Sequence, residues 1–160
     1  SAAGEHETAL LANVHNAAFG SHDTPETYLR VMRIPGFHVQ QELVVVAPDG
    51  QFAAYLVYWL DPISKAGLFE TVGCCPEFRR KGLTKALLVE GMMHMSEVGM
   101  NRALLSYCAG SEAAAHLYAS LGFTKNYYFL EYTKSFSEKL TLRAGRSETC
   151  LPQITRRSLS

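Results

Sequence analysis

The stretch VGCCPEFRRKGLTKALL, residues 72–88, constrains the fold of this 160-residue chain more than any other segment. An apolar run stops at Pro76, three consecutive bases follow, and Gly82 precedes a sequence with helical periodicity. This order predicts a strand that ends at a basic loop and leads directly into a helix. The first N–H groups of a helix are unpaired and carry a partial positive charge. The order therefore favours a phosphate or pyrophosphate site, with a solvent-exposed basic turn as the alternative.

Apolar spacing and turn residues predict the other elements. Residues that recur at three- and four-residue steps predict a helix over Thr8–Phe19, and Pro25 marks the start of a second helix that ends near Arg33. The elements predicted after these are strands Leu43–Ala47, Phe52–Leu60 and Gly67–Cys75, helix Gly82–Val98, strand Ala103–Cys108, helix Ser111–Ser120 and strand Phe123–Thr133.

This element order predicts a single α/β (α+β) domain over residues 1–160, built on a mixed, mostly antiparallel sheet that helices flank. The part that carries its motifs is expected over residues 68–134, and the tail over residues 135–160 has weak periodicity. No strand is predicted before the first helix, so the expected fold lacks a strand at its start. A sequence truncated at its N-terminus is one explanation for this missing strand.

Composition and charge narrow the classes of function. The formal net charge of zero combines −5 over residues 1–76 with +5 over residues 77–160. A net charge of zero disfavours a nucleic-acid binder, which would have to use the basic loop and the basic tail. No apolar run reaches the roughly 18–20 residues that span a membrane. The cysteines form no C-x-x-C pair and the six histidines no i,i+4 pair, so we expect no metal site and free thiols in a reducing cytoplasm.

Two segments together resemble the GCN5-related N-acetyltransferases, the GNAT superfamily. PEFRRKGLTKALL is similar to that family's motif Arg/Gln-x-x-Gly-x-Gly/Ala, with Arg79, Gly82 and Thr84 on its three positions. SEAAAHLYASLGF, residues 111–123, is similar to the family's Asn-x-x-Ala-x-x-x-Tyr-x-x-x-Gly-Phe. The positions in register there are Ala114, Tyr118, Gly122 and Phe123.

The resemblance implies a GNAT fold with splayed central strands, and acetyl-CoA or another acyl-CoA as the donor cosubstrate. The basic loop would hold the pyrophosphate, and backbone groups of the preceding strand would pair with the pantetheine arm. The cofactor-binding residues expected on this basis are Val72, Gly73, Cys74, Arg79, Arg80, Lys81, Gly82, Leu83, Thr84, Ser111 and Ala114. Thr84 departs from the usual Gly/Ala and Ser111 from the usual Asn, which we expect to alter individual cofactor contacts without abolishing binding.

Direct transfer from the thioester to an amine needs a neutral amine, a polarised carbonyl and a proton for the departing thiolate. Tyr118 matches the family's tyrosine for this last role, with aromatic packing as the alternative. Glu70 is the predicted base because period-2 alternation places it on the strand face of Val72 and Cys74, with a strand-edge carboxylate as the alternative. Tyr107 is a weaker candidate, and Cys74 is expected to pack rather than to act as a nucleophile.

The acceptor is less defined than the donor. The resemblance places its site around residues 19–38 and the last strands, where the candidate lining residues are Tyr28, Phe37, Tyr55, Tyr58, Trp59, Tyr127 and Tyr128. The acidic N-terminal half would attract a cationic amine. We therefore expect an N-acetyltransferase for an amine of a small molecule or peptide, as a homodimer or beside a partner GNAT domain. The alternative is a catalytically silent acyl-CoA-binding module, or half of a tandem GNAT protein.

Overall fold

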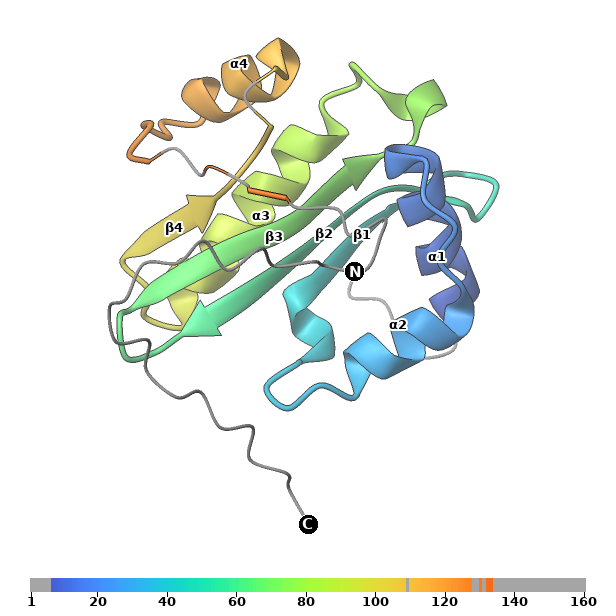
Figure 1. The fold of residues 1–160 in the computed structure, drawn as a ribbon, viewed down its shortest axis with the longest axis horizontal. Helices are drawn as coiled ribbons and strands as arrows, with labels where there is room; N and C mark the ends of the chain where they lie inside the picture. The colour runs from blue at the N-terminus through green and yellow to red at the C-terminus, as the bar shows by residue number, and fades with distance from the viewer. Residues whose placement is uncertain (1–6, 109, 128–129, 131, 134–160) are drawn as a thin grey trace, which may run out of the picture. The chain divides into compact units, whose positions relative to one another are not determined.

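The computed structural model describes residues 7–108, 110–127, 130, 132 and 133 (Figure 1). The chain divides into two compact units, residues 1–125 and 126–160, and every helix and strand named below belongs to the first. The helices are α1 (Thr8–Phe19), α2 (Pro25–Met32), α3 (Leu83–Glu97) and α4 (Glu112–Ser120), with short 3₁₀ turns η2 (Val39–Gln41) and η3 (Pro76–Phe78). The strands are β1 (Glu42–Val46), β2 (Phe52–Asp61), β3 (Ala66–Cys74) and β4 (Arg102–Leu105).

The four strands form one sheet in the order β1-β2-β3-β4. The β1–β2 and β2–β3 pairs are antiparallel, and β3 and β4 run parallel because α3 carries the chain back between them. β3 and β4 pair only over Ala66–Phe69 and Arg102–Leu105. The expected mixed, mostly antiparallel sheet with central strands that part is therefore confirmed.

A β-bulge in β3 marks the place where these two strands part. Tyr58 of β2 pairs with Phe69, whereas the next residue back, Val57, pairs with Thr71, so Glu70 is an extra residue. A bulge bends the strand that carries it. Pairing with β4 ends at Phe69, and this explains why the strand predicted over Ala103–Cys108 ends early, at Leu105.

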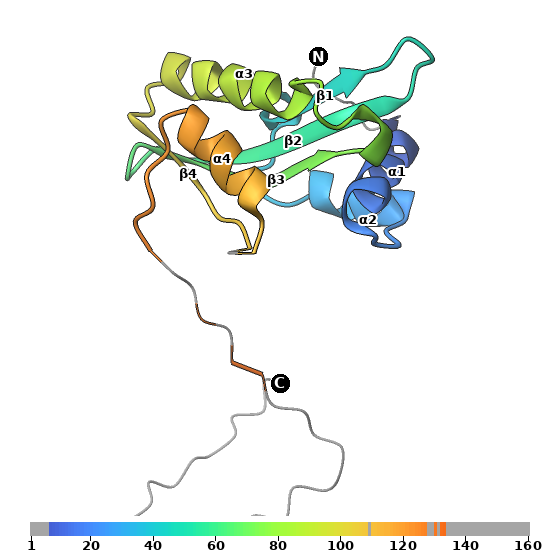
Figure 2. The same ribbon diagram turned by 90° about the horizontal axis from the view of Figure 1, so that it is seen from above.

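Figure 2 shows α3 on one side of the sheet and α1 and α2 on the other. An apolar cluster lies on each face. α1 and α2 cover one face, where they pack with the β2 residues Tyr55 and Val57. α3 covers the opposite face with Leu56 and Tyr58, and α4 residues pack against this second cluster. Alternate residues of β2 thus belong to opposite layers, as period-2 geometry requires for a central strand buried on both faces.

The segment Phe123–Thr133, predicted as a strand, forms none in its described residues. Aromatic composition favours extended backbone, but a strand also requires a neighbouring edge with which to pair. Residues 128, 129 and 131, and the tail from residue 134, lie outside the described residues. Among the helices that the structure describes, none is both long and apolar enough to cross a membrane.

Gly91 lets α3 approach the sheet closely, and its replacement by Ala is expected to destabilise the fold. A Cβ at this position would lie 2.7 Å from Cε1 of the buried Phe69 and 3.4 Å from a Leu56 methyl group. The helix gains about 1 kcal/mol of intrinsic propensity from Gly→Ala, but overpacking a rigid core costs about 1–3 kcal/mol. Urea unfolding should therefore show a net loss.

The double variant Gly91→Ala/Phe69→Leu is the control for this steric account. It should lose less free energy of unfolding than the two single variants lose together, because the smaller Leu frees the space that the Ala methyl group needs. Additive losses would contradict the steric explanation.

Candidate functional site

The N-terminus of α3 has the features of an anion-binding site. β3 ends at Cys74, η3 follows, and the loop to α3 passes through left-handed backbone at Arg80 (φ 62°) and Gly82 (φ 78°). Gly82 is the N-cap residue, no side chain caps the helix, and its first turn contains no acidic residue. The first N–H groups of α3 are therefore left without a side-chain acceptor, which is the arrangement that phosphate groups exploit at helix N-termini.

The three bases of the loop differ in their surroundings. The Arg79 guanidinium donates to the backbone oxygens of Cys74 and Ala18, each at 3.4 Å, so it joins the end of β3 to the end of α1. The Lys81 ammonium lies 4.9 Å from the centre of the Phe78 ring. Arg80 is exposed. Arg79 therefore helps to hold the loop, while all three side chains contribute positive charge beside the uncapped helix.

The backbone edge of β3 beyond Phe69 is free on the side of β4. Among the described residues no strand pairs with this edge over residues 70–74. Val72 and Cys74 pack toward the α3 face of the sheet, whereas a Cβ at Gly73 would lie 2.6 Å from Tyr55 and 3.1 Å from Phe19 on the α1 face. The backbone groups of this edge that no strand pairs are thus next to the uncapped helix end, where the Cys74 carbonyl oxygen accepts from Arg79.

Cys74 lacks the features of an activated thiol. Burial raises its pKa, an effect that outweighs the lowering by Arg79 and by a hydrogen bond with Thr84. Burial likewise raises the pKa of the Cys75 thiol, which donates to the Phe52 carbonyl oxygen at 3.4 Å. Because the thiolate is the nucleophilic form, these environments favour packing over covalent catalysis.

The bulge changes the argument that selected Glu70. Phe69, Val72 and Cys74 all contact the cluster on the α3 face, which is possible only because the extra residue at the bulge interrupts the alternation. The alternation of strand faces therefore cannot be used to place Glu70 on the same face as Val72. The Glu70 side chain is exposed, at the point where the edge of β3 becomes free.

Tyr118 of α4 lies in an aromatic group at the other side of the parted strands. Its ring centre is 5.5 Å from that of Tyr107 and 6.1 Å from that of Phe123. Burial raises the pKa of Tyr118, and Tyr107 adds to the rise, so the phenol remains protonated near neutral pH. At the start of α4, Ser111 Oγ accepts from the Ala114 N–H at 3.4 Å, so these two predicted cofactor contacts also cap the helix.

The aromatic residues predicted to line an acceptor site do not form one group. Tyr28, Tyr55, Phe37 and Trp59 contact the cluster under α1 and α2. Tyr58 belongs instead to the α3 face, where its hydroxyl donates to the Gln40 carbonyl oxygen at 3.2 Å. Tyr127 is exposed, and Tyr128 lies outside the described residues.

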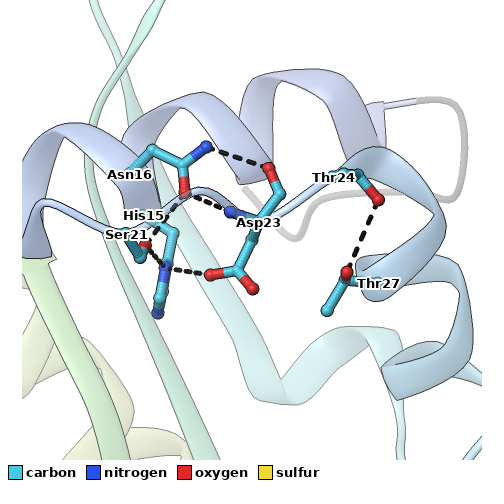
Figure 3. A network of polar contacts seen from close by, with 6 residues as sticks. All are labelled: His15, Asn16, Ser21, Asp23, Thr24 and Thr27. Carbon is cyan, nitrogen blue, oxygen red and sulfur yellow. Dashed lines mark hydrogen bonds and ion pairs between the residues drawn. The ribbon is translucent and has the colours of Figure 1, made fainter.

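A polar network at the end of α1 was not predicted from the sequence (Figure 3). His15 Nδ1 lies 2.8 Å from Asp23 Oδ2 and 2.7 Å from Ser21 Oγ, and Asn16 bonds both Ser21 and the Asp23 backbone. Left-handed Gly20 ends the helix and turns the chain back on it. Gly20 directly after a helix is the sequence signal that could have placed residues 21–23 beside His15.

Two cavities lie outside the predicted donor site. One of about 480 Å³ is lined by residues of β1 and α3, among them Leu43, Leu87 and His94. The other, of about 280 Å³, lies along α1 and includes Phe52, Cys75 and Glu77 in its lining. Neither contains a residue predicted to bind cofactor or to act in catalysis, so the candidate site rests on the free edge of β3 and the uncapped end of α3.

Comparison with known sequences gives one family and several curated relatives. Residues 9–123 match the profile described as the acetyltransferase (GNAT) family. The mycothiol acetyltransferase of Paenarthrobacter aurescens (strain TC1) is 29% identical over 133 residues, covering 76% of this chain and 40% of that protein. That of Thermobispora bispora is 41% identical over 54 residues, covering 34% of this chain and 18% of that protein. The chain thus spans well under half the length of these relatives.

Solved structures share the fold at low sequence identity. The ribosomal-protein-S18-alanine N-acetyltransferase of Escherichia coli superposes with a TM-score of 0.64 at 20% identity, covering 79% of this chain and 77% of that one. A GCN5-related N-acetyltransferase of Sphaerobacter thermophilus gives a TM-score of 0.65 at 22% identity, covering 75% of this chain and 41% of that one.

Proposed function

The chain belongs to the GNAT family of acetyltransferases, and from that membership we propose that it transfers the acetyl group of acetyl-CoA to an amine of a small molecule or peptide. The observation that carries the proposal is the uncapped, base-flanked N-terminus of α3 beside the free edge of β3. A pyrophosphate suits the first feature and an extended amide-bearing arm suits the second. The pyrophosphate and the amide-bearing arm are both parts of acetyl-CoA, so these observations support the donor and leave the acceptor open.

The proposed reaction uses groups of β3 and of α4, which lie on either side of the gap between β3 and β4. The amine attacks the thioester carbon, the C–N bond forms, and the C–S bond breaks. A backbone N–H of β3, such as that of Cys74, polarises the carbonyl, and the Tyr118 hydroxyl donates a proton to the departing thiolate. Glu70 no longer rests on strand alternation, but its carboxylate is exposed where the edge of β3 becomes free, and it takes the proton that the amine nitrogen loses after attack. The products are the acetylated amine and CoA with a free thiol.

Isothermal calorimetry tests the donor site, with Gly82→Ala as the informative variant. Wild type is expected to bind acetyl-CoA, and free CoA should compete for the same site. Gly82→Ala should weaken binding at least about tenfold, because a side chain disfavours the left-handed backbone that presents the loop to the helix end.

Gly99→Ala is the matched control. Gly99 follows the other end of α3, has a similar φ of 85°, and, like Gly82, would have no atom within 4 Å of an added Cβ. Both variants should lose similar stability, but Gly99→Ala should keep the affinity for acetyl-CoA. Equal losses of affinity would remove the anion-site argument, and a wild type without binding at millimolar acetyl-CoA would overturn the proposed function.

A panel of amines, assayed by release of the CoA thiol, then addresses the acceptor. Because the curated relatives are named mycothiol acetyltransferases, mycothiol-related amines belong in this panel beside alkylamines and peptide amino termini. Binding of acetyl-CoA without turnover of any amine would favour a catalytically silent acyl-CoA-binding module.

A further inference from the structure

The proton positions in the network at the end of α1 can be assigned from its contacts (Figure 3). The Asp23 backbone fixes the Asn16 amide, because its N–H donates to Asn16 Oδ1 at 2.8 Å and its carbonyl oxygen accepts from Asn16 Nδ2 at 2.9 Å. Asn16 Oδ1 also accepts the Ser21 hydroxyl proton at 2.9 Å. Since a hydroxyl has only one proton to donate, that of Ser21 acts toward His15 as an acceptor.

His15 must therefore carry a hydrogen on Nδ1. Ser21 Oγ at 2.7 Å and Asp23 Oδ2 at 2.8 Å both accept from this nitrogen. In the neutral imidazole the other nitrogen, Nε2, then keeps a lone pair. Among the described residues, the polar partners of the imidazole all lie at Nδ1 and none at Nε2. A carboxylate on Nδ1 and a free lone pair on Nε2 is the arrangement of a general base, in which the carboxylate stabilises the imidazolium that forms.

The same contacts exclude Ser21 as an activated nucleophile. Ser21 and Asp23 share one nitrogen of His15, and the hydroxyl proton of Ser21 is directed to Asn16. A nucleophilic serine would instead have to donate its proton to the imidazole nitrogen opposite the carboxylate. Ser21 and Asn16 therefore hold the ring in place, and Nε2 is the nitrogen that keeps a lone pair.

His15 lies on the α1 face of the sheet, next to the segment 19–38 where an acceptor site is expected. Its ring centre is 5.8 Å from that of Tyr55, and Tyr55 pairs across the sheet with Gly73 of β3. Phe19, 5.0 Å from His15 between ring centres, contacts the same glycine, where a Cβ would lie 3.1 Å from its ring. The imidazole thus lies near the Tyr55–Gly73 pair of the sheet. The residue after Gly73 is Cys74, whose N–H is proposed to polarise the thioester.

The environment of His15 suits an ammonium group. Burial raises the pKa of both Tyr28 and Tyr55 well above the ordinary range, so the aromatic side chains around the imidazole remain uncharged. Asp23 supplies the one negative charge of the network. The His15 side chain is 24% exposed, so the ring is in contact with solvent.

An acceptor amine has to lose two protons. An alkylamine is mostly protonated near neutral pH, so one proton must leave before the nitrogen can attack, and a second leaves after the C–N bond has formed. The function proposed above uses Glu70 for the second proton only. Removal of the first proton is a separate step, which a base beside the bound ammonium group would carry out within the site.

We propose that His15 is a further catalytic residue, whose Nε2 takes the first proton from an ammonium acceptor before attack. The inference rests on the proposed function and adds a cationic amine as its acceptor class. R–NH₃⁺ gives its proton to Nε2, the neutral R–NH₂ attacks the thioester, and the imidazolium, held by Asp23, releases the proton to solvent. Asp23, Asn16 and Ser21 are positioning residues for this step.

Nitrogen NMR of the full chain tests the premise without any substrate. Two-bond ¹H–¹⁵N correlations distinguish the two imidazole tautomers, and His15 should show hydrogen on Nδ1 and a lone pair on Nε2. Asp23→Asn, which removes the charged acceptor, should shift the tautomer population or increase exchange between the two forms. A neutral His15 imidazole with its hydrogen on Nε2 in wild type would overturn the proposal.

Kinetics of His15→Gln test the role itself, with the alkylamine that wild type acetylates fastest in the panel. At pH 7 kcat/KM for the amine should fall about 10²–10⁴-fold. The deficit relative to wild type should shrink as the assay pH approaches about 10, where the free amine is abundant. Acetyl-CoA affinity should not change, and His22→Gln, which alters an exposed neighbour of the network, should behave as wild type.

The outcomes separate this inference from the function on which it rests. Unchanged turnover of His15→Gln at pH 7, or a deficit that stays constant up to pH 10, would overturn the role of His15 and leave the acetyltransferase intact. A wild type that acetylates no amine would remove the proposed function and this inference with it. A deficit that disappears with rising pH, together with the Nδ1–H tautomer, supports the proposal.

Discussion

Replacing Tyr118 with Phe is expected to lower turnover about 10²–10⁴-fold while acetyl-CoA affinity stays close to that of wild type. The substitution keeps the ring, and with it the contacts to Tyr107 and Phe123. It removes only the hydroxyl, which burial keeps protonated by raising its pKa. A thiolate that leaves without this proton is a poorer leaving group, so the loss should appear in kcat, and calorimetry should show the unchanged affinity.

Tyr107→Phe is the matched control, since Tyr107 contributes the neighbouring ring of the same group. It should retain most of the turnover if Tyr118 is the acid. Equal turnover of Tyr118→Phe and wild type would show that the assignment is wrong. A large loss in Tyr107→Phe alone would transfer the role to Tyr107, the weaker candidate from the sequence.

Local patterns in the sequence predicted most of the fold. The helix over Thr8–Phe19 was predicted with its bounds, and the strand–loop–helix order around Gly82 is as expected. These features depend on apolar periodicity, caps and turn residues, which act within one or two helical turns. The proposed donor site could be formulated from the sequence for the same reason, because it consists of consecutive backbone groups in one short segment.

Features that depend on pairing between distant segments could not be predicted in this way. The bulge at Glu70 is visible only in the register of β3 against β2, and it breaks the alternation on which the choice of Glu70 rested. The early end of β4 at Leu105 follows from the same change in register. His15 and Asp23 lie close together because Gly20 reverses the chain after α1. Apolar periodicity does not predict such a contact between a helix and the loop that follows it.

Glu42 gives the second large expected effect, on stability rather than activity. Its side chain, at the start of β1, is 2% exposed, and its Oε2 has no hydrogen-bond partner among the described residues. Burial, followed by the charge of Glu7, raises its pKa from the ordinary 4.5 to about 7. The folded state therefore holds this proton more tightly than the unfolded state does.

The sign of the resulting pH dependence follows from linkage. A group with a raised pKa in the folded state contributes its stability fully below the unfolded pKa and loses it as the pH rises through the folded value. Between about pH 4.5 and 8 this shift corresponds to a loss of about 3 kcal/mol. Glu42→Gln cannot ionise, so its free energy of unfolding should fall less than that of wild type by about this amount.

Urea unfolding of wild type and Glu42→Gln at pH 4.5, 6 and 8 measures the difference directly. The exposed Glu112→Gln is the control, and its pH dependence should follow that of wild type. The comparison uses the change with pH within each protein, so any constant cost of burying the Gln amide cancels. Parallel curves for wild type and Glu42→Gln would mean that Glu42 ionises in the folded protein at its ordinary pKa, and that the α1 face of the sheet accommodates a buried negative charge.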